Sequence, residues 1–365
     1  MIERFRRFRR HPWVRWGAPF LFLALAVFFL RDRADFFIRG LAAVRRTDPA
    51  GVGAVLLASL ASLYAMATVL RLLLRAGGVK VRRRDANALT FASNSWSSSF
   101  PGGQAFSTVL QYQTMRSWGA GVMVCSWQIV LSGALSTMWL VALGVSAIVV
   151  LGADLSLLSL LGTFGIMSLL AWAVYWASDN PRYVARWVRR WWPRFNRLRR
   201  RDRNEGLDDI LDHVHQLHDV RLTVPRFAVV ALWSLLNWCF DIVALWASVW
   251  AVTGVFPAIY ADADHTTIAG VTLAYVTAKI AGTVQATPGG LGPVEAAMTA
   301  TLVAVGMTGV NAFGAVFVYR MISFLTVTAI GWLVYLVYFT RRGVNKKSLA
   351  AASAVTAPED RNRLR

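Results

Sequence analysis

The chain has 365 residues, of which 56% are hydrophobic, and its formal net charge is +20. Uncharged apolar runs recur from one end to the other, and a run of about 20 such residues can cross a bilayer. The basic residues gather in clusters that flank these runs on alternate sides, as in membrane proteins whose cytoplasmic loops are positive. Composition therefore indicates an integral membrane protein, and the charge pattern argues against a nucleic-acid partner.

In chain order, the apolar runs predict an all-α polytopic protein with about eight transmembrane helices. The candidate spans are 17–30, 51–70, 119–150, 155–177, 227–253, 266–287, 291–308 and 311–340. The first and the seventh of these runs are short for a span.

The clusters of Lys and Arg also predict how the chain lies in the cell membrane. We expect residues 1–16 to form a basic cytoplasmic N-terminus and residues 17–340 to form one transmembrane domain. The loop 178–226 divides this domain into halves, and because it is rich in Arg we expect it in the cytoplasm. The tail 341–365 is basic and rich in Ala and Ser, which predicts a disordered cytoplasmic segment.

A weakly apolar stretch, 86–118, is interrupted by Pro101 and Gly102 and is not typical of a simple span. Asn94 begins a run rich in hydroxyl groups just before this interruption. Irregular backbone at membrane depth is tolerated only inside protein or beside a water-filled cavity. We therefore interpret the stretch as a re-entrant hairpin that lines a cavity. The alternative is an interfacial loop followed by an amphipathic helix through Arg116.

The most informative segment is a second Pro/Gly break, which lies between two apolar runs and carries charge. It contains Pro288, Gly289, Gly290, Gly292 and Glu295. Glycines let the backbone turn sharply, and the half-helix that follows directs its positive dipole end toward the break. The two breaks form a weak internal repeat, and paired interruptions of this kind indicate a transporter-like site.

Four ionisable residues lie well inside the predicted membrane domain: Asp241, Lys279, Glu295 and Arg320. Their charges sum to zero, and because an unpaired charge is costly at membrane depth we expect them to converge. With Asn237, they are candidates for a polar cavity that accepts a lipid headgroup, in which Lys279 and Arg320 bind phosphate. The alternative is that they form interhelical pairs that only stabilise the bundle.

The sequence contains no nucleophile elbow, P-loop, dinucleotide fingerprint or zinc-protease helix, so we expect no catalytic residue and no cofactor. His213, His215 and His218 form the one candidate metal cluster. His213 does not share a helical face with the other two, and we interpret this segment as a solvated helix without a metal.

The sequence Pro-Gly-Gly-Leu-Gly-Pro-Val-Glu from Pro288 to Glu295 resembles the signature of the lysylphosphatidylglycerol synthase transmembrane-region family of flippase-like membrane proteins. Three other pieces are similar to motifs of this family. They are Asn237-Trp238 with Asp241, Tyr319-Arg320, and Asn94 with Pro101-Gly102. The resemblance covers about 50–340, which is nearly the whole predicted membrane domain.

Family members with a known role carry aminoacylated phosphatidylglycerol across the bilayer, and others act in cell-envelope glycolipid pathways. The resemblance therefore implies a protein that translocates or binds a phospholipid or glycolipid headgroup, with anionic or aminoacylated membrane lipids as its partners. A second hypothesis is a non-transporting partner or scaffold of a separate lipid-modifying enzyme. A third hypothesis is a membrane glycosyltransferase, an activity that would require acidic residues on a long extracytoplasmic loop.

The sequence departs from the family in two respects. Gln104 to Ser107 replace the Gly-Glu pair and the Arg that commonly follow the first break, which leaves the headgroup open. No soluble aminoacyl-transferase domain follows before Arg365. We therefore expect a stand-alone translocation module that does not synthesise the lipid.

Overall fold

The computed structural model describes residues 47–152, 222–258, 266–283 and 287–342, and the single residues 165, 169 and 176. Contacts divide the chain after Thr47, and the following description concerns the unit that begins at Asp48. The predictions for the span 17–30, the His-containing segment and the two termini lie outside the described residues. The same holds for the span 155–177, apart from the three single residues, and for almost all of the loop 178–226.

Four helices in the described part are long and apolar enough to cross a membrane, which confirms an all-α membrane fold. They are α4 (Pro49–Ala76), α7 (Val122–Val150), α11 (Val224–Thr253) and the continuous helix Gly309–Tyr338. They correspond to the predicted spans 51–70, 119–150, 227–253 and 311–340. The last consists of α14 (Gly309–Arg320), the π-helix η3 (Met321–Thr326) and α15 (Val327–Arg342).

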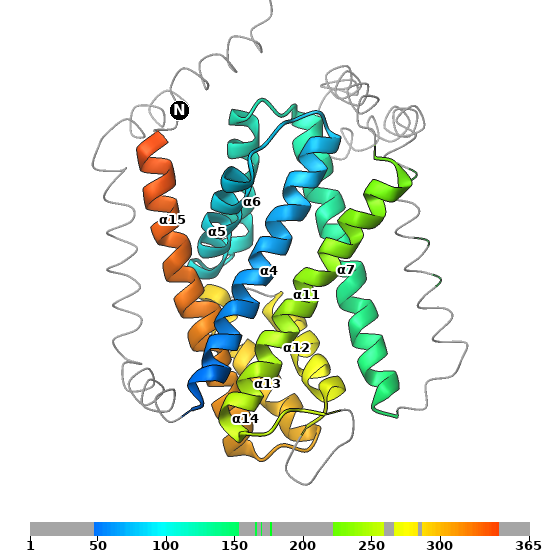
Figure 1. Ribbon diagram of the computed structural model, residues 1–365, viewed down its shortest axis with the longest axis vertical. Helices are drawn as coiled ribbons and strands as arrows, with labels where there is room; N and C mark the ends of the chain where they lie inside the picture. Colours follow the sequence, from blue (N-terminus) through cyan, green and yellow to red (C-terminus); the bar gives the residue numbers. More distant parts are fainter. Residues whose placement is uncertain are drawn as a thin grey trace, which may run out of the picture. The chain divides into compact units, whose positions relative to one another are not determined.

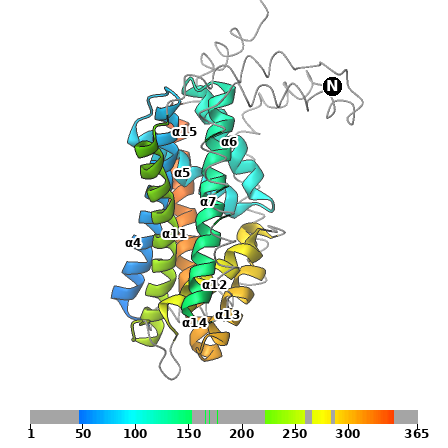
Figure 2. The same ribbon diagram turned by 90° about the vertical axis from the view of Figure 1, so that its right-hand side faces the viewer.

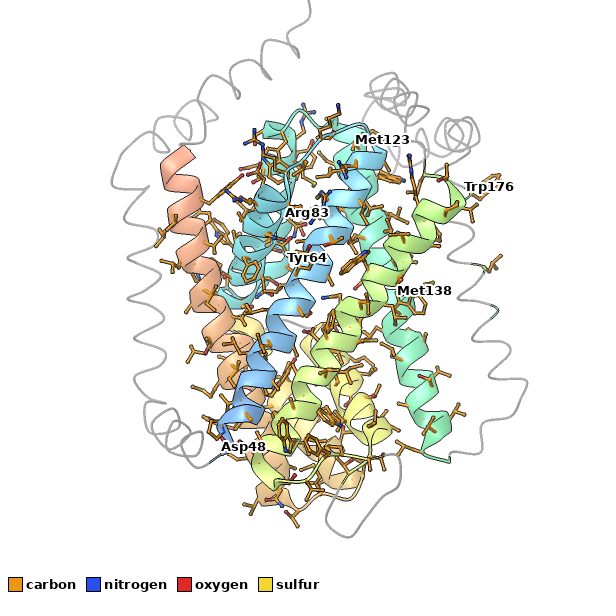
Figure 3. The ribbon with its side chains drawn as sticks, viewed as in Figure 1. Asp48, Tyr64, Arg83, Met123, Met138 and Trp176 are labelled. Carbon is orange, nitrogen blue, oxygen red and sulfur yellow. The ribbon has the colours of Figure 1, made fainter. Side chains whose placement is uncertain are left out.

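The helices run between two ends of the bundle, which differ in charge. At the basic end, α4 ends and α5 begins around Arg75, Lys80 and Arg82 to Arg84. At the opposite end, α4 begins at Pro49, and the Asp48 side chain caps it by accepting the N–H of Ala50 at 3.0 Å. Asp48 and Met123, which lies near the start of α7, mark these two ends in Figure 3.

The first Pro/Gly break joins two helices, α5 (Arg83–Ser99) and α6 (Gly103–Ser117), into a hairpin that starts and finishes at the basic end. The helices have 17 and 15 residues, so they reach about 25 and 22 Å. A hydrocarbon core is about 30 Å thick, so neither helix spans it. The predicted re-entrant hairpin is therefore present, and the alternative of an interfacial loop is wrong.

The second break lies in a matching hairpin that starts and finishes at the opposite end. Its helices are α12 (Ile268–Gly282) and α13 (Pro293–Ala304), with 15 and 12 residues. These lengths correspond to about 22 and 18 Å. The segments 266–287 and 291–308, which we expected as spans, are therefore the two arms of a re-entrant hairpin. The Pro/Gly-rich break, rather than the length of the apolar runs, determines their structure.

The two hairpins approach each other from opposite ends of the bundle. Figures 1 and 2 show α5 and α6 in one half and α12 and α13 in the other. The helix α5 contacts η2 (Pro288–Gly290), the short 3₁₀ helix inside the second break. The second break therefore lies against the first arm of the first hairpin.

The order of the elements is that of an inverted repeat. Within the described residues, each half contains a span, a re-entrant hairpin and a second span, and the two halves run in opposite directions through the bundle (Figure 1). The packing follows the same symmetry, because α5 packs on α15 of the other half and α12 packs on α7. The internal repeat predicted from the two Pro/Gly breaks thus extends to whole helices.

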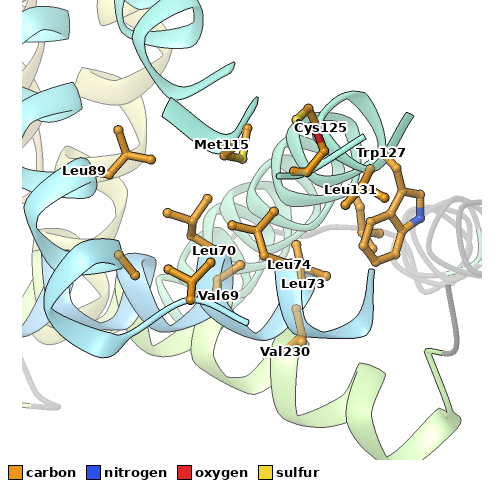
Figure 4. Close-up of a cluster of buried hydrophobic side chains, with 14 of the residues drawn as sticks. Val69, Leu70, Leu73, Leu74, Leu89, Met115, Cys125, Trp127, Leu131 and Val230 are labelled. Carbon is orange, nitrogen blue, oxygen red and sulfur yellow. Dashed lines mark hydrogen bonds between the residues drawn. The ribbon is translucent and has the colours of Figure 1, made fainter. Parts of the chain in front are cut away.

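The two halves are joined by α4 and α11, which pack along each other more extensively than any other pair of described helices. Near the basic end, a buried apolar cluster adds α6 and α7 to this contact (Figure 4). Its fully buried members include Leu73 and Leu74 of α4, Met115 of α6 and Cys125 of α7. This cluster fixes the end of α4 and the base of the first hairpin.

Candidate functional site

The tip of the first hairpin turns at Gly102, whose φ of +61° lies in the left-handed region that favours glycine. The next residue, Gly103, is also required, because a Cβ there would overlap the carbonyl groups of Trp96 and Ser97. Pro101 and Gly102 are exposed at this turn. The sequence around the first break therefore specifies a tight reversal in which α6 begins directly against α5.

An aromatic and hydroxyl contact fixes the tip of this hairpin on α15. The indoles of Trp96 and Trp332 stack with centroids 6.1 Å apart, and the Trp332 N–H donates to the Ser99 hydroxyl at 2.9 Å. One turn earlier, the fully buried Ser95 hydroxyl donates to the carbonyl of Thr328 at 2.9 Å. A Cβ at Gly331 would overlap Ser95, so the two helices approach at the distance that glycine allows.

The second break contains three glycines with positive φ: Gly289 at +57°, Gly290 at +70° and Gly292 at +101°. Pro288 begins the 3₁₀ helix, and Pro293 begins α13, where its missing N–H costs nothing. Each of the three glycines therefore provides a backbone conformation that other residues adopt only with strain.

Glu295 and Arg320 form an ion pair that holds this break in place. The second carboxylate oxygen of Glu295 accepts the N–H of Gly292 at 2.6 Å, which caps α13. Arg320 also donates to the carbonyl of Gly289 at 2.9 Å. The side chains of Glu295 and Arg320 are 17% and 14% exposed, so each depends on the other for compensation of a mostly buried charge.

Asp241 and Lys279 form a second ion pair, between α11 and α12, with 3.5 Å between Nζ and Oδ2. The same Oδ2 accepts a hydrogen bond of 2.6 Å from the hydroxyl of the fully buried Tyr275. The Lys279 ammonium lies 5.0 Å from the ring centroid of Tyr275 and 5.4 Å from that of Trp238. This is within the range of cation–π attraction.

The four charges expected to converge are thus joined two by two. One pair links α11 to α12, and the other links α13 to α14 beside the second break. The pairs differ in exposure, because the Lys279 side chain is 40% exposed while the other three are below 20%. Lys279 is therefore the cation of this set that is most accessible to a ligand.

Within the described residues, neither candidate asparagine bonds to these charges, and the bonds of Asn237 run to α4. Asn237 donates to both the carbonyl and the hydroxyl oxygen of Ser62 on α4, at 3.0 and 2.7 Å. It therefore joins α11 to α4. This is the behaviour expected if the polar residues form interhelical pairs that only stabilise the bundle. Asn94 is half-buried on α5, next to the buried Ser93.

Sequence reasoning missed Phe324 and the π-helix that carries it. The ring of Phe324 lies 4.5 Å from the Arg320 guanidinium carbon, and a Cβ at Gly289 would overlap it. The π-helix begins directly after Arg320, and π-helical turns frequently occur at functional sites. The segment Met321–Thr326 contains neither Pro nor Gly, so the sequence gives no local signal of the irregularity.

A helical bundle with charged re-entrant segments defines an integral, multi-pass membrane protein. The sequence profile of the family described as the lysylphosphatidylglycerol synthase TM region matches residues 16–331. The chain therefore belongs to this family, in agreement with the resemblance carried by the second break. No curated protein matches the chain.

Proposed function

We propose that the protein binds the headgroup of a membrane phospholipid or glycolipid between its two hairpins and moves it across the cell membrane. The observation that carries the proposal is the contact of α5 with η2, beside the Glu295–Arg320 pair. Non-helical backbone and ionisable groups persist at membrane depth where they line a wet cavity, and they mark pathways for polar substrates.

The inverted repeat gives this site a mechanism for access from both leaflets. In transporters with inverted repeats, the substrate binds near the midplane between the repeats, where broken helices meet. Here each hairpin enters from a different end, and α5 of the first hairpin contacts η2 in the break of the second. Movement of one hairpin relative to the other would open the polar site toward one side at a time, while the acyl chains remain in the bilayer.

Lys279 is the group that we assign to the headgroup phosphate. It is more exposed than the other three intramembrane charges, and the Asp241 carboxylate and two aromatic rings lie beside its ammonium. A phosphate oxygen that binds Lys279 would replace Asp241 as its anionic partner. The Tyr275 hydroxyl, which donates to Asp241, would then remain to compensate that carboxylate.

Buried polar atoms near the first break support a hydrated or ligand-filled site. The hydroxyls of Ser93 and Thr328 and the indole N–H of Trp96 are buried without a hydrogen-bond partner among the described residues. Such an atom costs about 1–3 kcal/mol when it is left unsatisfied. Water or the polar groups of a lipid would supply the missing partners.

The proposed activity is non-catalytic: the protein moves the lipid, and a separate enzyme modifies it.

One observation favours the scaffold alternative, in which no lipid moves. Each of the four intramembrane charges already has a partner within the described residues, as expected for interhelical pairs that only stabilise the bundle.

Replacement of Lys279 tests the choice between transport and scaffold. We expect Lys279→Met to slow translocation of fluorescent anionic or aminoacylated phospholipids in liposomes by at least about tenfold, which corresponds to ~1.4 kcal/mol. Lys279→Arg keeps the charge and should retain most of the rate. Equal rates for the wild type and the folded Met variant would contradict the proposal, and a wild type that moves no lipid of the panel would favour the scaffold.

The basic end is predicted to face the cytoplasm, because loops rich in Lys and Arg are retained there. We expect a cysteine at position 80 to be protected from an impermeant thiol reagent in intact cells, and a cysteine at Val310 to be labelled. Val310 is 84% exposed at the opposite end. The background protein should lack Cys125 and Cys239. Labelling of position 80 from outside would reverse the assignment.

A further inference from the structure

A groove of about 460 Å³ lies at the basic end, outside the polar site described above. Its lining consists of five basic residues and one valine. They are Arg71, Arg75, Lys80, Val81, Arg82 and Arg83. None of these residues is acidic, so the groove presents positive charge alone.

The fold brings these cations together by joining the end of α4 to the start of α5. Arg71 and Arg75 are four residues apart and therefore lie on the same face of α4. A turn at Gly78, with φ of +79°, reverses the chain and places Arg82 and Arg83 beside them. The cations are held close although like charges repel, and a bound anion would relieve that repulsion.

The floor of the groove is rigid, which distinguishes it from a set of mobile surface side chains. Val81 is 8% exposed and belongs to the buried cluster that also contains Leu73 and Leu74. Arg71 is half-buried, whereas Arg75 is exposed at the rim. The groove therefore has a fixed base with guanidinium groups at two depths, and guanidinium groups bind phosphate through paired hydrogen bonds.

The helix α5 adds a second source of positive potential. Its N-cap residue, Arg82, makes no side-chain cap hydrogen bond. The first N–H groups of a helix are unpaired within it and carry the positive end of the helix dipole. The acidic residue of this first turn, Asp85, is buried and accepts the Tyr338 hydroxyl at 2.8 Å.

The depth of the groove favours a lipid phosphate over a soluble one. The helix α4 has 28 residues and a length of about 42 Å, which exceeds the hydrocarbon thickness of about 30 Å. Because basic residues gather at this end of α4, we expect its last turns, from Arg71 to Ala76, to lie in the headgroup layer. A phosphate in this layer belongs to a phospholipid whose acyl chains extend along the apolar surface below.

We propose that this groove binds the phosphate of an anionic phospholipid at the basic end, separately from the polar site between the hairpins. The bound lipid sits at the base of the first hairpin, because α5 begins in the groove. It need not be the lipid that the protein translocates, and the site does not depend on the proposed transport.

The test uses the full-length protein purified in a neutral detergent. Ligands that bind the folded state raise its thermal midpoint by mass action, so short-chain phosphatidylglycerol, short-chain phosphatidylcholine and inorganic phosphate are titrated separately. We expect phosphatidylglycerol to stabilise the protein well below the concentration that phosphate requires. The variant Arg71→Gln/Arg75→Gln/Arg83→Gln should lose about a hundredfold in affinity, from roughly fivefold for each charge removed.

The control is Arg84→Gln/Arg226→Gln, which removes two exposed charges that do not line the groove, one fewer than the triple variant, and should retain most of the affinity. Arg71→Lys/Arg83→Lys keeps the charge but not the paired geometry, and it gives a readable intermediate loss if the triple variant does not fold. Equal losses in the groove and control variants would overturn the proposal. Stabilisation by phosphate that equals that by phosphatidylglycerol would reassign the groove to a soluble anion.

Discussion

Arg320→Gln is expected to destabilise the protein by about 3–5 kcal/mol, because it leaves the mostly buried Glu295 carboxylate without its cation. The loss extends to the break, since Arg320 also holds the carbonyl of Gly289. We expect a lower thermal midpoint in detergent and a large loss of lipid translocation in liposomes. Glu295→Gln alone should show the same direction, because it leaves Arg320 uncompensated.

The double variant Glu295→Gln/Arg320→Gln separates stability from function. It removes both charges, so no uncompensated charge remains, and the thermal midpoint should recover much of the loss. If the pair also takes part in headgroup binding, translocation should stay low in this folded protein. Recovery of both the midpoint and the rate would show that the pair only stabilises the bundle.

Gly289→Ala is expected to stop translocation with a smaller effect on folding. The residue has a φ of +57°, which costs a non-glycine residue about 1–2 kcal/mol, and a new Cβ would overlap the Phe324 ring. We expect the alanine to displace η2 and therefore the contact with α5. The measurement is the translocation rate in liposomes, together with the thermal midpoint and monodispersity in detergent.

Two further variants show whether the loss of translocation in Gly289→Ala comes from the overlap with Phe324 or from backbone strain. Gly289→Ala/Phe324→Leu removes much of the overlap but not the backbone strain, so partial recovery would assign the rest to the left-handed conformation. Gly53→Ala is the control, because it lies inside α4 and a Cβ there meets no atom within 4 Å. A normal rate for a well-folded Gly289→Ala protein would remove the break from the mechanism.

Apolar length and Pro/Gly spacing predicted the membrane class, the four described spans and both breaks. Apolar length failed for 266–287 and 291–308, because apolarity does not distinguish a span from an arm that turns back inside protein. The glycines of the second break indicated the turn, since three positive-φ positions among four residues, Gly289, Gly290 and Gly292, cannot continue a helix. The first hairpin was easier to predict, because its hydroxyl-rich sequence could not be taken for a lipid-facing span.

Among the candidate site residues, composition identified the charges but not their partners. Charge neutrality predicted that Asp241, Lys279, Glu295 and Arg320 would converge, and the structure joins them as two ion pairs. Their division into two pairs depends on how the helices cross, which no local pattern specifies. The spacing of Asn237 and Asp241 places them on the same helical face. The Asn237 side-chain amide nevertheless donates hydrogen bonds to Ser62, because α4 lies against that turn of α11.

The packing of the first hairpin depends on a helix that is synthesised much later in the chain. Ser95 and Ser99 of α5 bond to Thr328 and Trp332, each separated by 233 positions in the chain. Before α15 is synthesised, α5 and α6 are two short helices with polar faces, for which lipid provides no hydrogen-bond partners. The hairpin therefore gains these two hydrogen-bond partners only after α15 is synthesised.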